Sequence, residues 1–133
     1  MKIPKGGLPI TTPFPISSHF EVAPPGGKVM AYMFPMDGDI DEGSVYIGEL
    51  PPGGTSVVAR IHTQDGLVSK TLLVEGNKIS APLGVSVKKM DRLEVIVEEG
   101  LRDVWVAFSW RPDVRDSIMK VLRQVKEIED AGV

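Results

Sequence analysis

Short segments that are apolar throughout, or that alternate between apolar and polar residues, fill positions 28 to 110, and turn residues such as Gly and Pro separate them. Segments of this length and pattern are typical of β-strands. The sequence has no strand–helix–strand unit, so a parallel α/β fold is excluded. We therefore predict a mainly β protein, with one antiparallel β-sandwich domain over residues 28–110. Its strands are expected at 28–36, 44–50, 55–63, 67–75, 78–81, 91–98 and 104–110, with turns at 51–54, 64–66 and 75–77.

The first 27 residues break this pattern, because they hold six of the eleven prolines. Proline fixes φ and removes a backbone donor, so this segment can be neither a helix nor a central strand. It also carries too many apolar side chains for a solvated tail. We expect an extended Pro-rich arm over residues 1–27 that lies on a surface of its own subunit or of a neighbour. Its attachment residues would be Leu8, Ile10, Phe14, Ile16 and Phe20.

The last residues of the chain have the pattern of a single helix, which we place at 112–131. Apolar residues recur there at the spacing of a heptad seam, namely Val114, Ile118, Val121, Val125 and Ile128. We therefore predict a C-terminal amphipathic helix within a segment of residues 111–133. Val and Ile at both seam positions favour trimers or higher oligomers over dimers. The same stripe would also suit a helix packed on its own sheet, and the sequence leaves that choice open.

Composition excludes several classes of protein. The net charge is −3 and the 15 Lys and Arg residues are scattered, so we expect no nucleic-acid partner. The lack of cysteine excludes disulfides and thiolate metal sites. Apolar runs are too short for a membrane span, and the prolines near the N-terminus do not fit a signal peptide. We expect no membrane partner, and synthesis in a cytoplasm followed by retention or release by lysis.

The acidic segment at 37–42 is the one candidate for a metal site. Alternating carboxylates of this kind hold hard cations such as Ca²⁺, and here they belong to Asp37, Asp39 and Asp41. Glu42, however, stands where the helix-loop-helix calcium pattern needs Gly, and Gly48 stands where it needs Glu. We interpret the segment as a solvated acidic turn, and we expect no metal and no cofactor.

Residues for catalysis or ligand binding are sparse. The two histidines, His19 and His62, have no cysteine beside them for a zinc site, and no G-x-S-x-G elbow presents a serine. We therefore expect no enzyme. An alternative function is a carbohydrate-binding β-sandwich module, in which exposed aromatic rings stack on sugars. The candidates are Trp105, Trp110 and Tyr46, although core packing is the more ordinary role of tryptophan.

Four stretches of residues 44–110 follow one another in a recognisable order: SVYIGELPPGG, TSVVARIHTQDGLVSK, KKMDRLEVIVEE and LRDVWVAFSW. Together they resemble the β-sandwich domain of tailed-bacteriophage virion structural proteins, which include head fibres, capsid decoration proteins, and collar and baseplate components. The third stretch usually contains G-D-R-L-x-V-x-V, and Met90 stands here in place of the glycine.

The resemblance implies a jelly-roll-like sandwich that serves structure or attachment, and it brings no family active site with it. We expect a virion component, most simply a capsid decoration or head-fibre protein. Its partners would be copies of itself, with a homotrimer favoured, and other virion proteins such as the major capsid protein. Its location would be the virion, after synthesis in the host cytoplasm.

Overall fold

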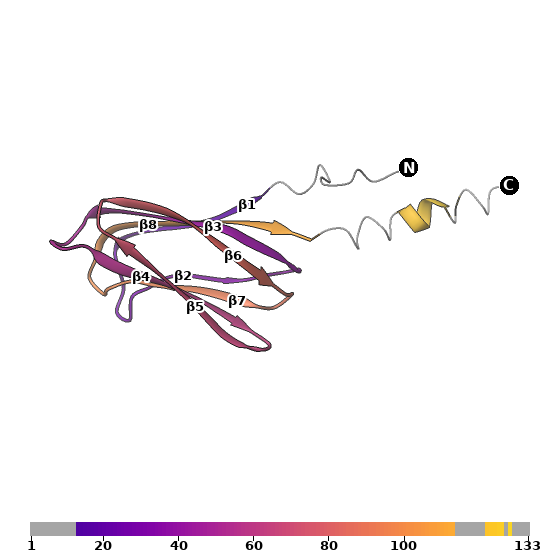
Figure 1. Cartoon of the computed structure of the whole chain (residues 1–133), viewed down its shortest axis with the longest axis horizontal. Coiled ribbons are helices and arrows are strands. Elements are labelled where there is room, and N and C mark those ends of the chain that lie inside the picture. Colours follow the sequence, from indigo (N-terminus) through magenta and orange to yellow (C-terminus); the bar gives the residue numbers. More distant parts are fainter. Residues whose placement is uncertain (1–12, 114–121, 127, 129–133) are drawn as a thin grey trace.

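The computed structural model describes residues 13–113, 122–126 and 128 of the chain. Within these residues eight strands form two antiparallel four-stranded sheets that pack face to face (Figure 1). The strands are β1 (Phe14–Val22), β2 (Lys28–Met33), β3 (Gly38–Glu49), β4 (Thr55–Thr63), β5 (Gly66–Val74), β6 (Lys78–Val87), β7 (Arg92–Ile96) and β8 (Arg102–Pro112).

The strand order identifies the type of sandwich. Sheet 1 has the order β1-β8-β3-β6 and sheet 2 the order β2-β7-β4-β5. Strands that follow one another in the chain therefore usually lie in different sheets, which is the arrangement of a jelly roll. The prediction of a mainly β, antiparallel, jelly-roll-like sandwich is confirmed.

The inner faces of the two sheets form one hydrophobic core. β4 buries Val57, Ala59 and Ile61, and the intervening residues point outward, as the two-residue period of a strand requires. β8 repeats the pattern with a buried face made of Val104, Val106, Phe108 and Trp110. The alternation in the sequence thus sets which face of each strand meets the core.

The sandwich begins earlier than expected, because β1 lies inside the segment assigned to the arm. β1 pairs with β8 along its length and forms an edge of sheet 1. An edge strand tolerates proline, since one side of its backbone needs no partner, and this accounts for Pro15. The expected boundary at residue 27 is therefore wrong: the sheet starts at Phe14. Leu8 and Ile10 lie outside the described residues.

The end of the sandwich also differs from expectation. β8 continues to Pro112, which lies opposite Gly38 of β3, so the helix cannot begin at Pro112. The pairing extends one step further, because the Asp113 amide donates to the Asp37 carbonyl at 2.7 Å. A proline at the last position of a strand removes only one terminal donor.

Residues 122–126 and 128 are helical, in agreement with a C-terminal helix, and among the described residues no helix is long and apolar enough to cross a bilayer. Val125 and Ile128 of the stripe are exposed. The other stripe positions, Val114, Ile118 and Val121, lie outside the described residues.

Candidate functional surfaces

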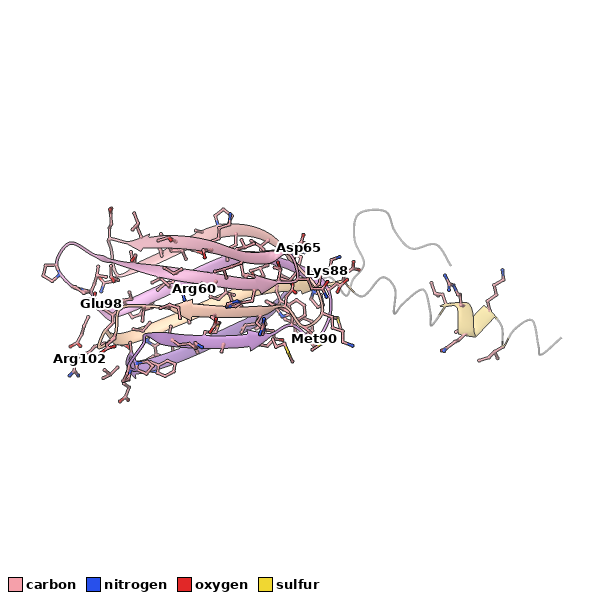
Figure 2. All side chains as sticks on the ribbon, turned by 90° about the horizontal axis from the view of Figure 1, so that it is seen from below. Arg60, Asp65, Lys88, Met90, Glu98 and Arg102 are labelled. Atoms are coloured by element: carbon pink, nitrogen blue, oxygen red, sulfur yellow. The ribbon has the colours of Figure 1, made fainter. Side chains whose placement is uncertain are left out.

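Both ends of the chain meet the sandwich at the same end, which we call the terminal end. Phe14, the first residue of β1, lies opposite Trp110 near the end of β8, and their rings are 6.3 Å apart. Figure 1 shows β1 and β8 side by side there. In Figure 2, Lys88 and Met90 lie at this end, and Glu98 and Arg102 lie at the other. Any attachment made by the two terminal segments therefore starts from one end of the molecule.

Exposed apolar side chains gather at the terminal end. Phe14 and Met33 are each 55% exposed, and Met90 is 63% exposed. Beside them is an open hollow of 540 Å³. It is lined by Phe14, Pro15, Ile16, Ser17, Tyr32, Pro35, Met36, Trp110 and Pro112. An exposed apolar patch next to both chain ends is typical of a surface that meets another protein.

The expected attachment residues of the arm divide between two environments. Ile16 and Phe20 pack against the core of their own subunit, so these two side chains serve the fold. Phe14 instead lines the hollow and is about half exposed. Of the described arm residues, Phe14 is therefore the one placed to meet a neighbour.

Met90 adopts a backbone conformation that favours glycine. Its φ is 74°, in the turn between β6 and β7, where its amide donates to the Phe34 carbonyl at 2.8 Å. A left-handed conformation costs a residue with a Cβ about 1–2 kcal/mol. Met90 stands where the phage-type pattern expects glycine, the residue that adopts a left-handed conformation at the least cost. The strained residue exposes its side chain and gains little packing within the subunit.

The acidic residues proposed as weak metal ligands do not converge. Asp37 accepts a hydrogen bond from the Lys89 amide at 2.8 Å, and Asp39 accepts one from the Ser86 hydroxyl at 2.8 Å. Asp41 pairs with the Arg111 guanidinium. Asp39 and Asp41 belong to strand β3 and not to a turn, which corrects the expected turn. Within the described part of the chain no three His, Cys, Asp or Glu residues form a metal-binding group.

One ionic cluster lies on the outer face of sheet 2. Glu94 of β7 contacts the Lys28 ammonium and His62 Nε2. Hydrogen bonds from Lys28 and from His62, in that order of importance, lower the pKa of the Glu94 carboxyl below its ordinary value. The cluster thus joins three strands of sheet 2 across its surface, and its groups still reach solvent.

A row of larger side chains crosses the outer face of sheet 1. The strand register places one residue from each strand in this row: His19, Trp105, Tyr46 and Lys78. The neighbouring row holds only small residues, Ser17, Ala107, Ser44 and Ser80. The contrast between the rows leaves an open groove of 570 Å³, which we call the outer-face groove. Trp105 is 49% exposed and Tyr46 is 43% exposed.

Trp105 is held in place on this face. Its indole N–H donates to Asp103 Oδ1 at 2.7 Å, and the same oxygen lies 3.0 Å from His19 Nε2. The His19 ring stacks on the indole with a centroid distance of 3.9 Å. The Asp103 side chain lies over Gly48, where an added Cβ would come within 1.9 Å of Asp103 Oδ2. Glycine at position 48 therefore makes room for the carboxylate that orients the indole.

The two tryptophans have opposite environments. Trp110 is buried and packs edge-on against Phe34 at 5.2 Å, so it is not available to a ligand. Trp105, five residues earlier on the same strand, faces solvent. The alternation of a strand predicts this division. Asp103, two residues before Trp105, shares its face of the strand, whereas His19 could not be predicted as a partner because it is far from both in sequence.

No family model and no curated protein matches the chain. Among solved structures, the C-terminal domain of A223, a structural protein of Sulfolobus turreted icosahedral virus, is 6% identical and has a TM-score of 0.34. The match covers 77% of this chain and 96% of that one. The tomato aspermy virus structure is 11% identical over 76% of this chain and 78% of that one, with a TM-score of 0.33. A cupin domain from Bordetella pertussis is 20% identical over 79% of this chain and 99% of that one, with a TM-score of 0.31. Scores this low carry no functional argument, and neither viral protein is from a tailed bacteriophage.

Proposed function

We propose that this chain is a structural component of a bacteriophage virion, a capsid decoration or head-fibre protein. It attaches through its N-terminal segment and associates with copies of itself. One observation carries the proposal: β1 begins and β8 ends at the terminal end, beside apolar side chains that the described part of the subunit leaves exposed. A body with its attachment segments at one end is suited to standing on a larger surface.

The jelly roll and the sequence pattern support the choice of a virion protein. Jelly rolls serve in viral capsids, in lectins and in cupins, so the fold alone leaves several classes open. The pattern of residues 44–110 that resembles phage virion domains favours the first class.

The C-terminal helix supports self-association. Val125 is 46% exposed and Ile128 is 72% exposed, so neither is covered by the chain's own sheets. Stripe positions that are exposed in one subunit favour packing on sister helices over packing on the sandwich. Since both terminal segments start from the same end, cyclic symmetry would bring all of them together around one axis, with a trimer favoured by the Val and Ile seam.

The test is the native mass of the full chain by light scattering. We expect three copies of the 14.4 kDa chain, and a monomer after Val125→Asp combined with Ile128→Asp. The matched control is Gln124→Asp combined with Lys126→Asp, which adds the same carboxylates at exposed helical positions off the stripe. The control should keep the oligomer. A monomeric unsubstituted chain that also fails to co-sediment with phage heads would refute the proposal.

A further inference from the structure

The outer-face groove is not used by the fold or by the proposed assembly. It lies on sheet 1 above a floor of small residues, and Trp105 and Tyr46 stand next to each other along one side of that floor. Its volume of 570 Å³ falls within the range of about 300–1,000 Å³ that is usual for small-molecule sites. A ligand bound there would be additional to the attachment made at the terminal end.

The groove has a preorganised aromatic wall. Asp103 fixes the indole N–H of Trp105, and His19 stacks on the ring. Asp103 has a left-handed φ of 55°, and Gly48 leaves the space that its carboxylate occupies. An exposed tryptophan that only fills surface needs no such support. Fixing the ring before binding reduces the entropy that a ligand contact would otherwise lose.

The chemistry of the groove matches a sugar ring. The negative π-face of an indole attracts the C–H groups on the apolar face of a pyranose. The floor supplies hydroxyl groups that both donate and accept hydrogen bonds. Ser44 and Ser80 are 2.9 Å apart, and Ser80 also donates to Glu42. An apolar wall beside a line of hydroxyl groups suits a ring that has one apolar face and a polar rim.

Charge narrows the class of sugar. Lys78 is the one charged side chain among the described residues that line the groove, and it forms no ion pair within the described part of the chain. It lies two strands from Trp105, about 10 Å between backbones at the usual strand spacing. We propose that the outer-face groove binds the pyranose ring of an acidic sugar, with the ring against Trp105 and Tyr46 and the carboxylate at Lys78.

The experiment is an NMR titration of the full chain with trimers of galacturonic acid and with galactose trimers of the same linkage. The acidic trimer is expected to bind saturably and to shift the Trp105 indole N–H. Trp105→Ala should weaken binding roughly tenfold or more, and Trp105→Phe should restore part of it. Lys78→Gln should weaken the acidic trimer about two- to fivefold and leave the neutral trimer unchanged. The matched control is Lys70→Gln on sheet 2, which should change neither.

The outcomes of this titration test the groove, and they do not depend on whether the chain forms oligomers. No saturable shift with either trimer, or equal binding by the Trp105→Ala variant, overturns the site. Equal affinity of the Lys78→Gln variant for both trimers supports the charge assignment, whereas an unchanged preference for the acid overturns it. If Trp105→Ala alters the native mass and not sugar binding, the groove is a protein contact and the sugar proposal fails. Thermal melting checks that each variant is folded.

Discussion

The two faces of β8 differ in what the protein uses them for. The inner face carries Phe108 and Trp110, which are 2% and 4% exposed and pack in the core. The outer face carries Asp103 and Trp105, which form a hydrogen-bonded arrangement in contact with solvent. Both faces have an aromatic ring, and both are defined by the same strand. Aromatic residues of one strand therefore stabilise the core on its inner face and form part of an exposed surface on its outer face.

The surface of the sandwich also contains a residue that lowers stability without adding to the packing of the core. Met90 keeps a strained backbone while its side chain lies in solvent. Strain at an exposed residue points to a role outside the subunit. If the core alone determined the sequence, glycine would be the better residue at this position.

The largest expected effect separates the two faces of β8. Phe108→Ala should lower the free energy of unfolding by about 3–5 kcal/mol, because it leaves a cavity in the core. Trp105→Ala should lower it by about 1 kcal/mol or less, because half of that side chain is already exposed. Urea denaturation of the two variants measures both values. Equal losses of free energy in the two variants would mean that the outer face packs as tightly as the core, which would contradict the difference between the two faces of β8.

A smaller effect is expected at the terminal end. Met90→Gly should raise the free energy of unfolding by about 0.5–1 kcal/mol, since relief of the left-handed strain outweighs the added entropy of the unfolded chain. Met90→Ala is the matched control, because it removes the side chain and keeps the strain, and it should leave stability nearly unchanged. Thermal melting compares the three proteins. A less stable Met90→Gly variant would show that Met90 packs within its own subunit.

The smallest effect is expected on the outer face of sheet 2. Glu94 has a lowered pKa in the folded chain, so the unfolded chain binds more protons in acid. Its contribution is therefore complete above the ordinary glutamate pKa of about 4.3 and is lost as the pH falls through the lowered value. Glu94→Gln should remove that part of the acid dependence, by no more than about 1 kcal/mol, because the groups reach solvent. Urea midpoints at pH 7 and in the acid range measure it. If the variant and the parent protein lose the same free energy of unfolding between pH 7 and the acid range, other carboxyls account for the acid dependence.

The core-facing half of the fold could be predicted from the sequence. Residues 55–63 and 67–75 flank a short Asp-Gly hairpin loop, and they became β4 and β5 within a residue at each end. The strands that were missed or shortened contain Pro, Gly or Asp, which are turn residues in isolation. Asp39 and Asp41 lie in the central strand β3, because neighbours on both sides complete its ladder and Ser86 and Arg111 pair with the carboxylates. Such long-range pairing overrides local preference.

The candidate surfaces were less accessible to sequence reasoning. Strand parity predicts that Trp105 and Trp110 face opposite ways, but it cannot decide which of them faces the core. The support of Trp105 comes from His19 on β1, which reaches Asp103 from 84 positions away. The apolar hollow at the terminal end combines residues of β1, β2, β8 and the turn after β2. Each surface depends on strand neighbours that the topology brings together.

The arrangement of the chain ends gives the opposite end of the sandwich a practical value. The turn between β3 and β4 lies at that end, and nothing within 4 Å would obstruct a Cβ at Gly53. If the terminal end is fixed to a particle, this turn points away from it. A foreign peptide inserted at Gly53 would then be displayed outward in as many copies as the particle carries subunits. The molecule is in this sense already oriented as a scaffold for presenting antigens.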